Sequence, residues 1–215
     1  MSRPDLSRTV AIVPVRSLSG AKSRLGEPLD PEERADLILA LLKRAVAAAL
    51  ASRRLDGVAV VSQDAELLVE ARAMGAASLL QAGDGLNEGL AETRDSICAE
   101  ATAVLVLPAD LPGVSAEAID RLVEVAAEAI ARRPDRAVVV LVSDRHGTGT
   151  NALLLAPPDA IPFRFGEGSR LAHAAEAAAS EATYMEVDGP LSFDVDTPED
   201  LLEADGGGLD HEAGR

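Results

Sequence analysis

The chain has 215 residues, a formal net charge of −16 at pH 7 and an aromatic content of 2%. This length suffices for one domain with a full hydrophobic core, whereas the acidity and the scarcity of aromatic side chains argue against duplex nucleic acid and anionic membranes as partners. The apolar runs are too short to span a membrane, the N-terminus lacks a secretory signal, and the single cysteine, Cys98, cannot form an internal disulfide, so we expect a cytoplasmic protein.

The first half of the chain alternates short apolar runs with longer segments of helical periodicity. Residues 9–15 are a β-branched apolar run, which is typical of a buried strand. Asp30 and Pro31 predict the start of a helix, because an acid at the cap and a proline in the first turn favour initiation. Apolar residues at helical spacing extend this helix to about Ser52. The further elements predicted here are strands at residues 57–62, 77–81 and 103–107 and helices at residues 65–74 and 87–101.

The second half continues the alternation of strands and helices. Ser115 is the predicted N-cap of a helix that reaches about Arg132, and a last helix begins at Thr197. The other predicted elements are strands at residues 137–142, 151–155 and 183–187 and a helix at residues 169–180. Apolar strands separated by amphipathic helices indicate an α/β fold, in which helices cover both faces of a parallel sheet. We expect one domain over residues 1–204 and a disordered glycine-rich tail over residues 205–215.

Four basic side chains near the N-terminus have no acid among them: Arg8, Arg16, Lys22 and Arg24. The last three belong to a loop that leaves the first strand at its carboxyl end, where open α/β sheets collect their ligands. Gly20 and the neighbouring serines allow close backbone approach, so the loop suits a polyphosphate, although the spacing of a Walker A motif is absent. A solvated basic loop without a ligand explains the charges equally well.

Asp110 lies in the stretch LPADLP, directly after a predicted buried strand. A carboxylate at a strand end, held between two prolines, is well placed to bind a divalent cation. The alternative is that Asp110 is a cap or turn residue.

Asp194 and Asp196 lie in the stretch SFDVDTP. In extended backbone their side chains project to the same side, so a cation or protons must separate the two charges. The alternative is that Asp196 or Thr197 caps the helix that follows, and one residue can serve both purposes.

A basic loop and carboxylates at one sheet edge together indicate nucleotidyl transfer. Mg²⁺ typically binds through one or two carboxylates and substrate phosphates, so the metal and a nucleoside triphosphate imply each other. The amide groups of Gly166, Gly168 and Ser169, near a predicted helix start, suit a second and smaller anionic substrate. A loop that ends in a capping serine is the alternative for this segment.

Five stretches, in order and spacing, resemble one known family: VPVRSLSGAKSRL, LPADLP, GTGTNALLL, FRFGEGS followed by His173, and FDVDTPEDL. The chain resembles, over residues 9–204, the 2-phospho-L-lactate guanylyltransferases of coenzyme F-420 biosynthesis, including their bacterial members that use phosphoenolpyruvate. The resemblance implies a single nucleotidyltransferase domain with a mostly parallel central sheet flanked by helices, similar to the molybdenum-cofactor guanylyltransferases and GT-A enzymes. It also implies transfer of GMP from GTP to a three-carbon phospho-acid, with release of pyrophosphate.

The resemblance also implies roles for individual residues. Lys22 and Arg24 are expected to hold the GTP phosphates, with Arg16 beside them, although the family has lysine where this chain has Arg16. The expected ligands of Mg²⁺ are Asp110, Asp194 and Asp196. The expected contacts of the acceptor are Thr150, Gly166 and Ser169. Asn87, in the stretch Gly85-Leu86-Asn87, matches the family pattern near the nucleobase.

Two other functions remain open from the sequence: transfer of another nucleotide, such as cytidylyl or uridylyl transfer to a sugar phosphate, and a nucleotide-binding module without turnover. The sequence does not distinguish phosphoenolpyruvate from 2-phospho-L-lactate or 3-phosphoglycerate as acceptor, and it leaves homo-oligomerisation open. His173 is expected to pack or to form hydrogen bonds rather than to act as a catalytic base, and Cys98 is expected to fill the core inside a helix.

Overall fold

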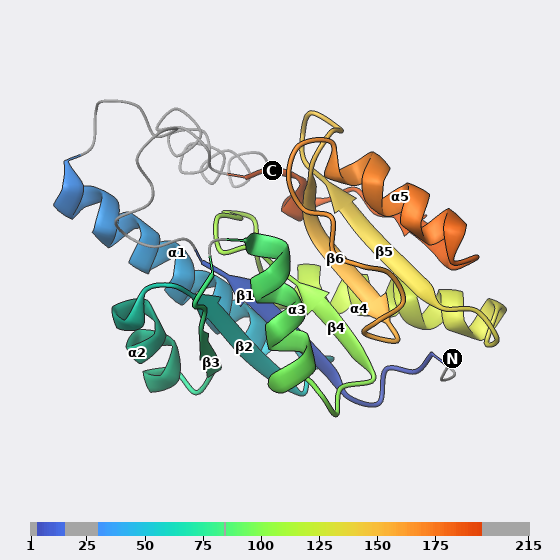
Figure 1. Cartoon of the computed structure of the whole chain (residues 1–215), viewed down its shortest axis with the longest axis horizontal. Coiled ribbons are helices and arrows are strands. Elements are labelled where there is room, and N and C mark those ends of the chain that lie inside the picture. The colour runs from blue at the N-terminus through green and yellow to red at the C-terminus, as the bar shows by residue number, and fades with distance from the viewer. Residues whose placement is uncertain (1–3, 16–29, 84, 195–215) are drawn as a thin grey trace, which may run out of the picture.

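The strands of the computed structural model form one seven-stranded sheet (Figure 1), and the structure describes residues 4–15, 30–83 and 85–194. The strands are β1 (Thr9–Pro14), β2 (Gly57–Ser62), β3 (Ala77–Leu80), β4 (Ala103–Val106), β5 (Val138–Ser143), β6 (Thr150–Ala156) and β7 (Thr183–Glu186). Their order in the sheet is β3-β2-β1-β4-β6-β5-β7, and every neighbouring pair is parallel except the two that β6 forms with β4 and β5. The predicted α/β fold with a mostly parallel sheet is therefore confirmed.

Helices cover both faces of the sheet, as Figure 1 shows. They are α1 (Pro31–Ala51), α2 (Ala65–Ala73), α3 (Leu86–Ser96), α4 (Ala116–Arg132) and α5 (Ser169–Ala179). Alternate residues of β1 point to opposite faces, so Val13 belongs to the apolar cluster on the face of α1, α2 and α4, whereas Ile12 belongs to the cluster on the face of α3 and α5. Because both faces are covered, the central strands are mostly apolar, and β4 is apolar along its whole length. Among the described residues, no helix has the length and apolar character needed to cross a membrane.

Two helix starts follow directly from capping side chains. The carboxylate of Asp30 accepts hydrogen bonds from the backbone N–H groups of Glu32 and Glu33, and the Glu33 carboxylate accepts one from the Asp30 N–H. At the start of α4, the Ser115 hydroxyl accepts a hydrogen bond from the Ala118 N–H. These bonds satisfy N–H groups that have no partner inside the helix, which is why both starts were predictable.

The helix predicted at residues 87–101 ends earlier, at Ser96. The N–H groups of Ile97 and Cys98 both donate to the carbonyl oxygen of Thr93, so the backbone turns away from helical geometry after Ser96. Cys98 therefore lies in a turn and not inside a helix, but it is buried in the core as expected. The prediction was wrong because the apolar residues after Ser96 continue the apolar periodicity of the helix, so the sequence pattern does not mark where the helix ends.

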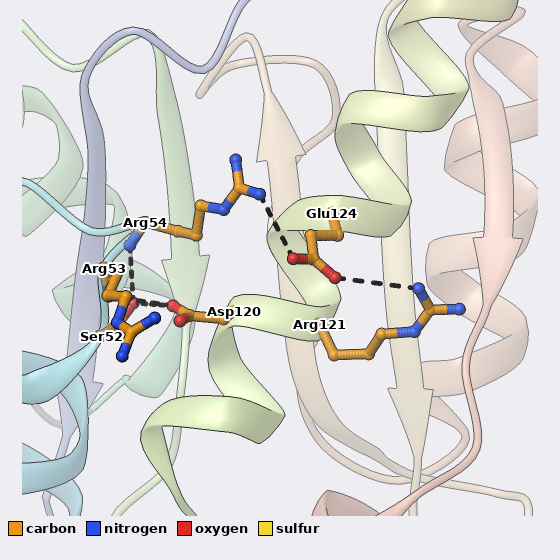
Figure 2. A network of polar contacts seen from close by, with 6 residues as sticks. All are labelled: Ser52, Arg53, Arg54, Asp120, Arg121 and Glu124. Atoms are coloured by element: carbon orange, nitrogen blue, oxygen red, sulfur yellow. Dashed lines mark hydrogen bonds and ion pairs between the residues drawn. The ribbon is translucent and has the colours of Figure 1, made fainter.

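A polar network fastens the segment after α1 to α4, as Figure 2 shows. Asp120 accepts hydrogen bonds from the Ser52 hydroxyl at 2.6 Å and from the Arg53 N–H at 3.1 Å. The Glu124 carboxylate lies 3.2 Å from the guanidinium of Arg54 and 3.9 Å from that of Arg121. The ion pairs are exposed and contribute little, so the partly buried Ser52–Asp120 bond is the main polar link between the two helices.

The topology brings several loops to one edge of the sheet. Strands β1, β2, β3, β4, β5 and β7 run in one direction and end at this edge, and β6 runs the other way and begins there. We call it the carboxyl edge; its described segments include residues 63–64, 81–83, 107–115, 144–149, the start of β6 and residues 187–194. The chain leaves β1 toward β2 on one side, whereas β4 lies on the other, so the edge contains the topological switch point at which α/β sheets bind ligands.

Candidate active site

The segments that carry Asp110 and Asp194 pack against each other at the carboxyl edge. Asp110 follows β4, and Asp194 follows a short 3-10 helix, η1 (Pro190–Ser192). A Cβ atom on Gly113 would collide with the backbone carbonyl oxygen of Pro190. The two backbones therefore approach as closely as they do only because position 113 has no side chain.

The buried side chain of Asn151 also fixes the segment before Asp194. Its Nδ2 donates a hydrogen bond of 3.0 Å to the carbonyl oxygen of Leu191. The second residue of β6 thereby holds η1 against the sheet, next to the end of β4. Asp110 and Asp194 are both half-buried at this edge.

Carboxylate oxygens at a sheet edge are suitable ligands for Mg²⁺. The third carboxylate of the predicted set, Asp196, lies outside the described residues, as do Arg16, Lys22 and Arg24 of the basic loop. Within the described part of the chain, no group of three or more His, Cys, Asp or Glu side chains could hold a metal ion. Metal binding by Asp110, Asp194 and Asp196 therefore stays a prediction.

Three residues predicted to contact the acceptor come from β6 and from the start of α5. Thr150 begins β6, Ser169 begins α5, and both are buried. Gly166 and Gly168, with φ angles of 126° and 68°, shape the turn into α5 in a conformation that favours glycine. The structure brings this turn against the β5–β6 connection, because the N–H of Arg170 donates to the Thr148 carbonyl at 3.2 Å.

The imidazole of His173 joins the start of β6 to the loop before α5. Its Nδ1 lies 3.1 Å from Oγ1 of Thr150, and its Nε2 accepts a hydrogen bond of 2.9 Å from the backbone N–H of Arg164. Burial, and next the nearby Arg164 charge, lower the pKa of His173 to about 4, so the ring is neutral at pH 7. The expectation that His173 forms hydrogen bonds is confirmed, but its two-sided contact was not predicted.

Asn87, near the start of α3, also holds the loop before α5. Its Nδ2 donates to the Phe165 carbonyl at 3.0 Å, and its Oδ1 accepts from the Phe165 N–H at 2.8 Å. The Phe165 ring in turn packs edge-on against His173, with 5.0 Å between ring centroids. The side-chain amide of Asn87 thus supports the loop of Gly166, and its predicted contact with the nucleobase stays a prediction.

Arg145 is a cation at the carboxyl edge that the sequence analysis did not single out. Its guanidinium carbon lies 4.9 Å from the centroid of the Phe193 ring, one residue before Asp194. Such stacking holds an arginine side chain over an aromatic face. No local motif signals this contact, because Arg145 and Phe193 meet only when β5 and β7 pair in the sheet.

The sequence matches the family model described as "Guanylyl transferase CofC like" over residues 9–212. A phosphoenolpyruvate guanylyltransferase of Sphaerobacter thermophilus is 46% identical over 92% of this chain and 93% of its own length. One of Rubrobacter xylanophilus is 47% identical over 92% of this chain and 94% of its own length. A 2-phospho-L-lactate guanylyltransferase of Methanothermobacter thermautotrophicus is 35% identical over 91% of this chain and 83% of its own length.

Solved structures show the same fold at low identity. A protein of Desulfovibrio desulfuricans G20, provisionally assigned as a nucleotide-diphospho-sugar transferase, is similar with a TM-score of 0.73 at 15% identity, over 95% of this chain and 89% of that one. A nucleotidyl transferase of Methanothermobacter thermautotrophicus gives a TM-score of 0.61 at 16% identity, over 92% and 95%. The fold is that of the nucleotidyltransferases, and by the family match and these identities the chain belongs to the CofC-like guanylyl transferase family.

Proposed function

We propose that this protein transfers GMP from GTP to the phosphate of phosphoenolpyruvate and releases pyrophosphate, as a step of coenzyme F-420 biosynthesis in the cytoplasm. The observation that carries the proposal is identity of 46% and 47%, over nearly the whole chain, to proteins named phosphoenolpyruvate guanylyltransferase. The relative named for 2-phospho-L-lactate is less similar, at 35%. Phosphoenolpyruvate is therefore the first acceptor to test.

The proposal divides the carboxyl edge between the two substrates. Lys22 and Arg24, with Arg16 beside them, would neutralise the phosphates of GTP, and Asn87 would lie near its base. The predicted acceptor contacts, Thr150, Gly166 and Ser169, would bind the carboxylate or phosphate of the smaller substrate. The support for this second group is geometric, because β6 and the start of α5 meet through His173 and Arg170.

The donor set at the carboxyl edge fits Mg²⁺, which prefers carboxylate and phosphate oxygens. Asp110, Asp194 and Asp196 would hold the ion. The close approach of Gly113 to Pro190 and the Asn151–Leu191 hydrogen bond support this proposal, because they hold the segments of Asp110 and Asp194 together. When bound, Mg²⁺ would supply positive charge to the phosphate oxygens.

The chemistry needs positioning more than proton transfer. A phosphate oxygen of the acceptor attacks the α-phosphorus of GTP, the bond from that phosphorus to the bridging oxygen breaks, and the electron pair leaves with pyrophosphate. The attacking phosphate is already ionised at neutral pH, so no side chain has to remove a proton. His173 matches this expectation, because its ring is neutral and its Nε2 already accepts the Arg164 N–H. Catalysis then consists of aligning the two substrates and of neutralising the phosphate charges with the basic side chains of the site.

A pyrophosphate-release assay tests the proposal directly. The protein is incubated with Mg²⁺ and GTP, and phosphoenolpyruvate, 2-phospho-L-lactate or 3-phosphoglycerate is added in turn, with mass spectrometry of the product. CTP and UTP with a sugar phosphate serve as controls. We expect pyrophosphate and a guanylylated phosphoenolpyruvate. Faster turnover with CTP or UTP would replace the proposed nucleotide, and GTP binding without pyrophosphate release would mean a nucleotide-binding module.

A further inference from the structure

The buried ring of His173 contacts two separate parts of the proposed acceptor site. The ring has no exposed surface, and its contacts come from β6, from the loop before α5 and from α5 itself. Each ring nitrogen has a different partner: Nδ1 faces the Thr150 hydroxyl, and Nε2 faces the Arg164 N–H. The two nitrogens can therefore serve two different purposes.

The hydrogen bond from Arg164 fixes the tautomer of His173. A backbone N–H can only donate, so Nε2 must offer its lone pair and carry no hydrogen. A neutral imidazole has one N–H, which must then lie on Nδ1. The backbone of Ser169, one helical turn before His173, also forms a hydrogen bond that favours a proton on the ring, which agrees with Nδ1 as a donor.

The tautomer in turn fixes the direction of the Thr150 hydroxyl. Nδ1 lies 3.1 Å from Oγ1 and, once protonated, has no lone pair to offer, so the hydroxyl hydrogen of Thr150 cannot be donated to His173. A hydroxyl has one hydrogen to donate, and the described residues supply no acceptor for it. Thr150 keeps 8% of its surface exposed and begins β6 at the carboxyl edge, where the proposed acceptor would contact it.

We propose that His173 is a positioning residue that makes the Thr150 hydroxyl an obligatory hydrogen-bond donor to the anionic acceptor, an inference that rests on the proposed function. Carboxylate and phosphate oxygens only accept hydrogen bonds, so an acceptor site is strongest where each neutral group is held as a donor. A threonine with a freely rotating hydroxyl would spend part of its time with its oxygen lone pairs toward the anion. The Nδ1–H group of His173 prevents this orientation.

The Nε2 bond serves a different part of the same site. It holds the backbone of Arg164, while Asn87 holds Phe165 next to it. Together these bonds set the path of the loop that carries Gly166 into the first turn of α5. Losing this bond is expected to affect loop order and stability, whereas losing the Nδ1 bond affects the direction of the Thr150 hydroxyl.

Two amide variants separate the two nitrogens. In His173→Asn, the side-chain amide can occupy the position of Nδ1 and donate to Thr150, but nothing reaches the Arg164 N–H. In His173→Gln, the longer amide can occupy the position of Nε2 and accept from Arg164, but Thr150 loses its donor. We expect His173→Gln to raise the KM for phosphoenolpyruvate about threefold, because the hydroxyl of Thr150 then has to be fixed in one of three staggered orientations on binding, with the KM for GTP unchanged. We expect His173→Asn to keep the KM for phosphoenolpyruvate close to the wild-type value, at some cost in stability because the Arg164 N–H loses its acceptor.

Variants of Thr150 complete the test. Thr150→Val removes the hydroxyl and should raise the same KM about tenfold or more, the effect of one lost hydrogen bond to a charged group, whereas Thr150→Ser should keep it near the wild-type value. In the double variant Thr150→Val with His173→Gln, the KM should rise no further than in the more affected single variant, because both changes remove one interaction.

Each outcome has a distinct meaning. If the wild-type protein releases no pyrophosphate from GTP with any phospho-acid, the proposed function fails and the variants are not needed. If the wild-type protein turns over but the Asn and Gln variants raise the KM for phosphoenolpyruvate equally, or raise the KM for GTP as much, the role of His173 is refuted.

A measurement on the wild-type protein decides the matter even if a variant does not fold. Long-range ¹H–¹⁵N correlation spectra of the histidine rings report which nitrogen carries the hydrogen. We expect the Nδ1-protonated tautomer for His173 at pH 7. The Nε2-protonated tautomer would overturn the proposal.

Discussion

The neutral ring of His173 links the stability of the fold to pH. Burial is the largest cause that lowers its pKa, from 6.5 to about 4, and the Arg164 charge adds to it. Between these two pKa values the His173 ring is protonated in the unfolded chain and neutral in the folded protein. The free energy of unfolding therefore falls as the pH is lowered through this window, and it is fully retained above the unfolded pKa.

Replacing His173 should remove this pH dependence. Between pH 7 and pH 5, the wild-type protein should lose about 2 kcal/mol more unfolding free energy than His173→Gln, which cannot be protonated. Urea unfolding of both proteins at the two pH values measures the difference, and titrating groups common to both cancel in the comparison. An equal loss in the two proteins would show that the ring does not remain neutral in the folded state.

At the scale of elements, two segments far apart in sequence meet at Gly113: the segment of Asp110 and the segment of Pro190 and Asp194. An alanine there would drive its Cβ into the carbonyl oxygen of Pro190, so the segments of Asp110 and Asp194 must move apart. We expect Gly113→Ala to lower the unfolding free energy by about 1–3 kcal/mol and to raise the Mg²⁺ concentration that gives half-maximal turnover.

Gly57→Ala is the matched control for this change. A Cβ there meets only the side chain of Val10 at ordinary contact distance, so unfolding and metal dependence should stay close to wild type. Equal behaviour of the two alanine variants would mean that the close approach at Gly113 does not position the carboxylates.

Asn87→Ala distinguishes between two interpretations of one side chain. The observed bonds to Phe165 support the loop of Gly166, so their loss should raise the KM for the phospho-acid and cost about 1–3 kcal/mol of stability. A direct contact with guanine would instead raise the KM for GTP. Steady-state kinetics with each substrate varied in turn separates the two effects.

Much of the secondary structure could be predicted because its signals are local. A short apolar run predicts the strand at Gly57–Ser62, and capping residues predict the starts of α1 and α4. The direction of β6 was not predicted, although a signal was present: the connection at residues 144–149 is too short for a parallel crossover, so β5 and β6 had to form an antiparallel pair.

At the scale of the whole molecule, the sheet brings several of the predicted site residues to one edge. The sequence placed Asp110 at that edge, because parallel strands end together, and motif resemblance indicated Thr150 and Ser169. The supporting contacts could not be predicted. His173 meets Thr150 across 23 residues and Asn87 meets Phe165 across 78, and such pairs depend on the finished fold rather than on spacing.

The charge of the whole molecule makes local positive charge necessary. The proposed substrates, GTP and a phospho-acid, are both anions, whereas the chain has a net charge of −16. The basic loop is expected to provide this charge, and Arg145 adds a cation beside Phe193. The net charge of the chain therefore does not predict substrate binding, and the site has to be tested by substituting individual residues.

The most direct test of the account is the rate of pyrophosphate release from GTP and phosphoenolpyruvate in saturating Mg²⁺, compared between Asp110→Asn and Asp135→Asn. Asp135 is an exposed carboxylate in the turn between α4 and β5 and serves as the matched control. We expect the Asp110 variant to lose about a hundredfold or more in turnover while keeping a wild-type unfolding transition, and the Asp135 variant to keep the wild-type rate. A folded Asp110→Asn protein with a near wild-type rate would contradict the assignment of the carboxyl edge as the catalytic site.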